Sequence, residues 1–169
     1  MKIRDRIKEL RRVKAGELIP NERNWRRHPK KQQEALQGIL AEVGYANALI
    51  AYQTKEGLKL IDGHLRASTT PDTEVPVLIL DVTEAEANKL LASLDPMAAM
   101  AESDASALDS LLRDVQTGSQ ALADMLTQLA QDAGAVKLPG ESPEDFQEVD
   151  ENIETNHECP KCGYKWSGE

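Results

Sequence analysis

The run VPVLILDV at residues 75–82 is the most apolar stretch of the sequence, and it constrains the fold more than any other feature. Such a run predicts a buried strand, and Pro76 stands near its start, where a missing N–H costs least. Directly after it, Thr83 and Glu86 form a T-x-x-E capping box, which predicts the start of a helix. One face of that helix is apolar, with Ala87, Leu90, Leu91 and Leu94. The sequence therefore predicts a buried strand followed at once by an amphipathic helix.

The same spacing of apolar residues, at i, i+3, i+4 and i+7, predicts three more helices. One ends at Gly44, a residue type common at helix C-termini, and two lie beyond residue 100, separated by Gly118. Their apolar faces are Leu36, Ile39, Leu40 and Val43; Leu108, Leu111, Leu112 and Val115; and Leu122, Met125, Leu126 and Leu129. Residues 48–52 and 58–61 flank the turn-like Lys55-Glu56-Gly57 and predict a β-hairpin. We expect the helical faces to pack on the domain or on a second copy of the chain.

Composition limits the class of protein. Aromatic residues make up only 4% of the chain, so a core must be built from Leu, Ile, Val and Ala. Every apolar run is much shorter than the roughly 20 residues that span a membrane, and the basic N-terminus lacks an apolar signal core. The sequence therefore predicts a soluble, cytoplasmic protein.

The sequence also predicts four segments. A domain over residues 1–100 precedes a helical segment over residues 101–133. Residues 134–156 hold seven carboxylates against one lysine and show no sustained period, which predicts a flexible acidic linker. Residues 157–169 then form a tail that contains both cysteines of the sequence.

Charge is distributed unevenly along the sequence. Residues 1–37 hold 12 Lys and Arg against 5 Asp and Glu, a net charge of +7, whereas residues 38–169 hold 8 against 24, a net charge of −16. A basic arm on an acidic body predicts a localised anion-binding face. The alternative is that the basic segment only neutralises the acidic body from within.

The stretch IDGHLR at residues 61–66 joins a predicted strand to a predicted short helix. Asp62, Gly63, His64 and Arg66 thus lie at a helix N-terminus, where free N–H groups and the helix dipole favour an anion, and where an arginine can fork onto a phosphate. One alternative is that Asp62 orients His64 as a general base for phosphodiester hydrolysis; another is that Asp62 only caps the helix. For Arg66 the alternative is a structural ion pair with Asp62 or Glu42.

A loop around Trp25 contains six basic residues, Arg23, Arg26, Arg27, His28, Lys30 and Lys31. Guanidinium groups interleaved with an aromatic ring suit a nucleic-acid backbone or a nucleotide base. The alternative is a solvated loop in which Trp25 anchors the chain to the core, and for Trp25 we favour that interpretation.

The tail contains Cys159-Pro160-Lys161-Cys162-Gly163, which has the pattern of a zinc knuckle, with two thiolates able to reach one ion. His157 is a candidate third ligand, but a closed structural zinc site takes four. Either a second chain completes the site or the knuckle is a remnant. A redox motif would need a strand and a helix around it, and a structural disulfide is not expected in a cytosolic protein.

The order of these features is a basic segment, Pro20-Asn21, an arginine-rich loop, a helix ending in glycine, a hairpin, G-H-x-R, a strand and further helices. This order resembles the N-terminal domain of the ParB/sulfiredoxin superfamily, and most of all the ParB-like domains of phages and mobile elements, often found beside DNA methyltransferases. The stretches that carry the resemblance are LIPNERNWRRHP (18–29), EVGYANALIAY (42–52), LIDGHLRA (60–67) and VPVLILDVTEAEANKLL (75–91).

The resemblance implies an α+β fold, a small mixed sheet with helices, and a pocket between the arginine-rich loop and the G-x-x-R turn. In partition proteins this pocket binds CTP and acts as a clamp switch. Gly63 and Arg66 match the glycine and an arginine of that turn, and Arg26 or Arg27 matches the arginine of the earlier loop.

The sequence also departs from these families. His64 stands where partition proteins have a glutamate, and the turn lacks the nucleophilic cysteine of sulfiredoxins, so the sulfiredoxin reaction is not expected. Leu94-Asp95-Pro96-Met97 replaces the Glu-Asn-x-x-Arg box of partition proteins, which argues against magnesium-dependent nucleotide hydrolysis. Because the sequence shows no helix-turn-helix domain after this point, sequence-specific partition is not implied.

The sequence therefore predicts a ParB-like accessory protein of phage or mobile-element DNA processing, modification or packaging. It would bind DNA or a nucleotide such as CTP, with zinc in the tail and no membrane contact, and would form a homodimer or larger oligomer. The candidate phosphate-binding residues are Gly63, His64, Arg66, Arg26, Arg27 and Arg23, and the candidate metal ligands are Cys159, Cys162 and His157. One alternative is a nuclease or nucleotide hydrolase with His64 and Asp62 as catalytic candidates. Another is an adaptor that docks a DNA methyltransferase or terminase.

Overall fold

A four-stranded mixed sheet with the strand order β1-β4-β2-β3 is the centre of the fold in the computed structural model, which describes residues 3–135 and 157–166. The chain forms two compact units, residues 1–136 and residues 137–169. The strands of the first unit are β1 (Ile7–Lys14), β2 (Leu49–Gln53), β3 (Leu58–Asp62) and β4 (Glu74–Leu80). Its helices are a 3-10 turn (Ala15–Glu17), α1 (Lys30–Glu42), α2 (His64–Thr69), α3 (Glu84–Ala99), α4 (Ala105–Asp114) and α5 (Gln120–Asp132). The predicted α+β class is thus confirmed.

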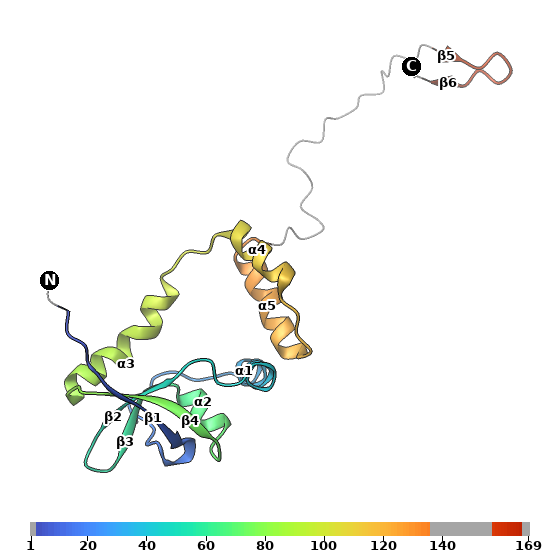
Figure 1. Ribbon diagram of the computed structural model, residues 1–169. Coiled ribbons are helices and arrows are strands. Elements are labelled where there is room, and N and C mark those ends of the chain that lie inside the picture. Colours follow the sequence, from blue (N-terminus) through green and yellow to red (C-terminus); the bar gives the residue numbers. More distant parts are fainter. Residues whose placement is uncertain (1–2, 136–156, 167–169) are drawn as a thin grey trace. The chain divides into compact units, whose positions relative to one another are not determined.

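Strand β4 is an interior strand of the sheet, as its apolar run predicts. It pairs with β1 in antiparallel and with β2 in parallel orientation, and Pro76 precedes the stretch that pairs with β2, which begins at Val77. Val75, Val77 and Ile79 are buried on one face, together with residues of β2, β3, α2 and the 3-10 turn. Leu80 belongs to the other face, which α3 covers with Ala87 and its neighbouring leucines. Helices therefore cover the two faces of the sheet (Figure 1).

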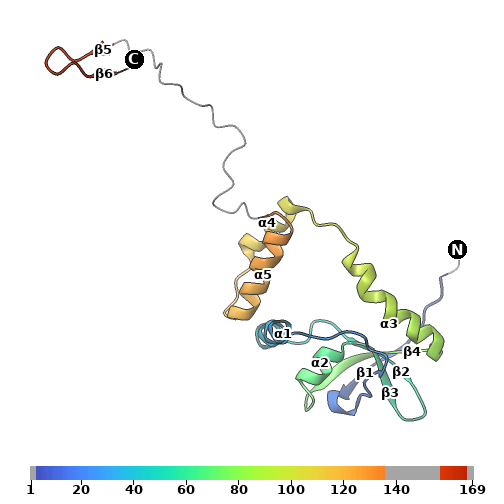
Figure 2. The ribbon, with the colours of Figure 1, turned by 180° about the vertical axis from the view of Figure 1, so that it is seen from behind.

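The predicted hairpin and helix starts are confirmed. Strands β2 and β3 pair in antiparallel orientation, and the Thr83 and Glu86 capping box has both of its hydrogen bonds. Helix α3 packs on the sheet through its first turns and then extends away from it toward α4, as the front and back views show (Figures 1 and 2). This geometry leaves Met97 and Met100 exposed at its end.

The basic N-terminal segment is not a free arm, because residues 7–14 form the edge strand β1. Just before the strand, the Arg6 guanidinium donates to both carboxylate oxygens of Glu86 at 2.8 and 2.9 Å and to the Asp81 carbonyl at 2.6 Å. This pairing holds the pKa of Glu86 at about 2, well below its ordinary value. Part of the basic charge is therefore neutralised within the fold.

Helix α5 packs on α1, so the apolar face of this helical segment is partly used inside the unit (Figure 2). One oxygen of Glu42, at the end of α1, accepts hydrogen bonds from the Thr117 hydroxyl and from the backbone N–H groups of Gly118 and Ser119, at 2.7 to 3.1 Å. Gly38 of α1 lies so close to the start of α5 that an added Cβ would be 2.2 Å from the Ser119 hydroxyl oxygen. Any larger residue at this position would push the two helices apart. The boundary near residue 100 stays a prediction.

Within residues 3–135 and 157–166, none of the helices has the length and apolar character needed to cross a bilayer. The predicted acidic linker over residues 134–156 lies almost entirely outside the described residues.

Candidate functional site

The arginine-rich loop is built from two similar turns. Asn21 accepts the backbone N–H of Arg23 with its side-chain oxygen at 3.0 Å, and Asn24 accepts that of Arg26 in the same way at 3.2 Å. Such turns are a common use of asparagine, whose short side chain bonds the backbone two residues on. Asn21 is also buried, and its amide donates to the Leu60 carbonyl of β3. These bonds fix the loop against the sheet, next to α2.

The Gly63 turn connects β3 to α2 in a conformation that favours glycine. Gly63 has a φ of 94°, and a Cβ at this position would lie 2.6 Å from Cγ of the fully buried Leu49. The first hydrogen bond of α2 runs from the Ala67 N–H to the Gly63 carbonyl at 2.9 Å. The N–H groups of His64, Leu65 and Arg66 therefore have no acceptor within the helix.

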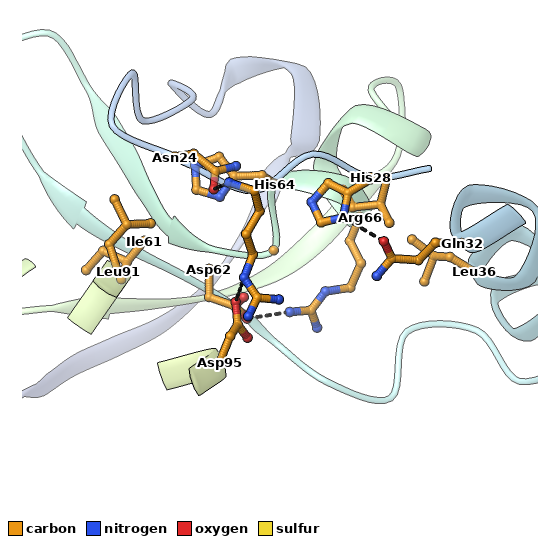
Figure 3. Close-up of a pocket in the computed structure, with 13 residues that line it drawn as sticks. Asn24, His28, Gln32, Leu36, Ile61, Asp62, His64, Arg66, Leu91 and Asp95 are labelled. Carbon is orange, nitrogen blue, oxygen red and sulfur yellow. Dashed lines mark hydrogen bonds and ion pairs between the residues drawn. The ribbon is translucent and has the colours of Figure 1, made fainter. Parts of the chain in front are cut away.

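The loop and the turn meet at a cavity of about 210 Å³ (Figure 3). Asn24, Arg26 and His28 come from the loop, Asp62 and the start of α2 from the turn, and Asp95 from α3. The full lining is Asn24, Arg26, His28, Gln32, Leu36, Ile61, Asp62, Gly63, His64, Leu65, Arg66, Leu91 and Asp95. Residues far apart in the sequence thus converge on one place.

Both arginines of the cavity are paired with a carboxylate. Arg66 Nη2 donates to Asp62 Oδ2 at 2.7 Å, and its Nη1 donates to the Asn47 carbonyl at 3.3 Å. Arg26 Nε lies 2.7 Å from Asp95 Oδ2, but its N–H is not directed at that oxygen, so this is a charge contact and not a hydrogen bond. The two arginines and two aspartates cancel in formal charge. An anion here must therefore rely on the free N–H groups of α2 or rearrange the ion pairs.

His64 has a structural role at the edge of the cavity. Its Nε2 accepts a hydrogen bond from the Asn21 backbone N–H at 3.1 Å, which leaves the proton of the neutral ring on Nδ1. Burial lowers the pKa of His64, and His28 adds to this effect while Asp62 opposes it. The ring is therefore mainly uncharged at neutral pH and can offer a hydrogen bond to a phosphate, but not a full charge.

The candidate catalytic pair is not arranged as a general base and its orienting acid. Asp62 bonds to Arg66, and among the hydrogen bonds of the described residues none joins Asp62 to His64. Of the two alternatives for Arg66, the ion pair is with Asp62, because Glu42 bonds instead to residues 117–119.

The structure places only some of the predicted phosphate ligands together. Arg26, Gly63, His64 and Arg66 line the cavity, whereas Arg23 and Arg27 are exposed residues outside its lining. The expectation that Trp25 anchors the loop to the core is wrong, because this residue is 59% exposed. Its ring contacts Arg26 instead, whose guanidinium carbon lies 5.1 Å from the ring centroid.

Sequence reasoning missed the contributions of Asn21 and Asn24, and it named Asp95 only as a poor replacement for the Glu-Asn-x-x-Arg box. The repeated N-x-R in NERNWR was a signal for the two turns. In each turn the asparagine side chain bonds the backbone N–H two residues later, and this bond positions the arginine there. No local pattern placed Asp95 in the cavity, which it reaches because α3 continues from Ala87 to Asp95 without a break.

The second unit contains a small hairpin in which β5 (His157–Glu158) pairs with β6 (Lys165–Trp166). Between the strands, the Cys159 N–H donates to the Tyr164 carbonyl, the Gly163 N–H donates to the Cys159 carbonyl, and Gly163 has a φ of 76°. The backbone N–H groups of Lys161 and Cys162 lower the pKa of the Cys159 thiol. No residue of 157–166 is buried.

The prediction of His157 as a third metal ligand is not supported. Within the described residues, no group of three or more His, Cys, Asp or Glu side chains is placed to share a metal ion. The His157 ring instead stacks on Trp166, with ring centroids 5.5 Å apart. The described tail therefore offers two thiols.

Comparisons with known proteins give a partial likeness to solved structures. No family model matches the sequence, and no curated protein matches it. Among solved structures, a C-terminally truncated chromosome-partitioning protein ParB from Caulobacter crescentus, complexed with CTP-gamma-S, is similar at 15% sequence identity and a TM-score of 0.49. The similarity covers 62% of this chain and 60% of that protein, so it spans less than two thirds of either.

Proposed function

We propose that this protein is a ParB-like domain that binds the phosphate groups of a nucleotide or of DNA at the cavity between the arginine-rich loop and α2. The observation that carries the proposal is one cavity lined by Arg26, Arg66 and the first turn of α2, whose N–H groups have no acceptor within the helix. Backbone N–H groups at such a turn bind anions, and guanidinium groups pair with phosphate through two parallel hydrogen bonds.

The two ion pairs of the cavity affect how a phosphate would bind. To bind a phosphate, each arginine would have to leave its aspartate or share its hydrogen bonds between the aspartate and the phosphate. A carboxylate released inside the cavity would cost free energy unless it found a new partner. A magnesium ion carried by the phosphates would supply that partner, since Mg²⁺ is commonly held by one or two carboxylates plus substrate phosphates. We therefore expect nucleotide binding to depend on magnesium and on both Asp62 and Asp95.

The decisive test is a calorimetric screen of the four ribonucleoside triphosphates and duplex DNA, with and without magnesium. Arg66→Ala should weaken every phosphate ligand by roughly 1.5 to 3 kcal/mol, the usual cost of a lost charged hydrogen bond. Arg113→Ala is the matched control, because it removes a similar i,i+4 pair with Asp109, on α4, which contributes no residue to the cavity. Equal affinities of the parent and Arg66→Ala would refute the proposal.

The pair of carboxylates also favours a second candidate, magnesium-dependent turnover of a nucleotide or a phosphodiester. The resemblance aligned Asp95 with the Glu-Asn-x-x-Arg box of partition proteins as a replacement that argues against hydrolysis, and in the structure Asp95 lines the same cavity as Asp62. Magnesium-dependent product formation by the parent protein that is abolished in Asp95→Asn would establish an enzyme. Binding without turnover favours the accessory role in phage or mobile-element DNA processing, with a methyltransferase or terminase as the candidate partner.

For the tail we propose a zinc ion shared by two copies of the chain. Cys159 and Cys162 supply two thiols, and the lowered pKa of Cys159 favours the thiolate that metals bind. A hairpin without buried residues also needs a cross-link to be stable. We expect metal analysis to give about one zinc per two chains, and none after Cys159→Ser. A full zinc in each monomeric chain would contradict the shared site.

A further inference from the structure

The cavity between the loop and α2 is too small for a whole nucleotide. Its volume of about 210 Å³ lies below the roughly 300 Å³ at which pockets for drug-sized ligands begin. If the phosphates occupy it, the base and part of the sugar must lie outside. The surface around the cavity therefore decides which phosphate compounds are preferred.

Trp25 is an exposed aromatic residue in the arginine-rich loop that borders this cavity. It stands between Asn24 and Arg26, which both line the cavity, and 59% of its surface is open to solvent. An exposed indole ring offers a flat face on which a nucleobase can stack. Trp25 is therefore available to a ligand that extends out of the cavity.

Arg26 fixes the position of this ring relative to the phosphate site. Its guanidinium lies under the ring at 5.1 Å from the centroid, while its Nε lies 2.7 Å from Asp95 inside the cavity. The turn made by Asn24 holds the Arg26 backbone at the same time. One side chain thus links an aromatic surface to a phosphate-sized cavity, and a cation under the ring strengthens stacking platforms of this kind.

We propose that Trp25 stacks on an unpaired nucleobase whose attached phosphate occupies the cavity, so that the site takes a base joined to phosphate and not phosphate alone. This inference rests on the proposed function and adds the base to it. The base belongs either to a free nucleotide or to single-stranded nucleic acid, which offer the same chemistry at this site. Stacking is tolerant of base identity, so we expect little preference among the four bases.

The test uses the two tryptophans of the sequence, Trp25 and Trp166. The full-length Trp166→Phe protein leaves Trp25 as the only indole, and its fluorescence is followed in titrations with a ribonucleoside triphosphate, an oligo(dT) strand and inorganic triphosphate. We expect strong quenching by the two ligands that carry bases and weak quenching by triphosphate. Quenching by oligo(dT) alone would assign the site to single strands, and quenching by the nucleotide alone would assign it to free nucleotides.

Affinity measurements complete the test with matched variants. Trp25→Ala should weaken the ligands that carry bases by roughly 5- to 150-fold, the range expected from 1–3 kcal/mol per stacked base, and should leave inorganic triphosphate unchanged. Trp25→Phe should retain most of the affinity. If triphosphate binds but Trp25 neither quenches nor affects nucleotide affinity, stacking is refuted and the phosphate site stands, with the base in another hollow such as that lined by Pro20 and Ser68. If no ligand binds at all, both the phosphate site and the stacking are refuted.

Discussion

Substitution of Gly63 by alanine tests whether the turn before α2 is fixed by the core beneath it. Gly63 has a φ of 94°, which costs an alanine roughly 1–2 kcal/mol. The added Cβ would also lie 2.6 Å from Leu49 Cγ and 3.1 Å from Leu49 Cβ. Leu49 is fully buried at the centre of the core, so it cannot move freely, and overpacking of this kind typically costs a further 1–3 kcal/mol. We expect Gly63→Ala to destabilise the protein by roughly 2–5 kcal/mol in total.

Gly44 provides a matched control for this prediction. Its φ of 87° is close to that of Gly63, but an added Cβ would meet no atom within 4 Å. Urea denaturation of Gly44→Ala therefore measures the backbone cost alone, and the difference between the two variants measures the clash. In the double variant Gly63→Ala with Leu49→Ala the 2.6 Å contact with Leu49 Cγ should disappear, leaving only the 3.1 Å contact with Cβ, so the two changes should cost less than their sum. Equal unfolding free energies for Gly63→Ala and Gly44→Ala would show that the close approach to Leu49 does not matter.

Three further predictions concern other parts of the fold. Because the pKa of Glu86 is lowered in the folded protein, its contribution to stability is complete above its ordinary pKa of 4.5 and is lost as the pH falls toward 2. The urea midpoint of Glu86→Gln should lack this part of the acid dependence. Identical pH profiles for the parent and Glu86→Gln would contradict the Arg6 pairing. Gly38→Ala should release α5 from α1, because the added Cβ would clash with Ser119, even though alanine has the better helix propensity. Hydrogen exchange should then show lost protection in α5 but not in the sheet, and full protection of α5 would exclude this explanation. If Arg23 and Arg27 contact DNA phosphates outside the cavity, reversing both to glutamate should flatten the slope of log K against log salt by about 0.9 for each lost contact, and an unchanged slope would remove them from the interface.

The elements with local signals could be predicted from the sequence. The capping box, the glycine after α1 and the turn between β2 and β3 each specify a boundary through residues only a few positions apart. The buried strand β4 was equally plain from its apolar run. These predictions needed no knowledge of which elements meet.

The features that sequence reasoning missed depend on contacts between distant segments. Residues 7–14 were treated as a basic segment because five of them are charged, yet β4 supplies a partner that makes them a strand. Trp25 was assigned to the core from its apolar character, but the turns at Asn21 and Asn24 hold the loop so that the ring stays outside. Asp95 entered the cavity through the path of α3, which no local pattern specifies. The candidate site was thus predicted in its turn and only partly in its loop.

The pairing of β1 with β4 sets an order of assembly. Strands β2 and β3 are joined by a short turn and can form as soon as both are synthesised, whereas Val13 must wait for Val75. Without β1, β4 would present a row of unpaired backbone groups beside Val75, Val77 and Ile79, which is a surface on which another chain could add a strand. Deletion of residues 1–14 should make this exposure permanent and cause aggregation. Strand β1 thus protects the edge of β4 from pairing with a neighbouring chain.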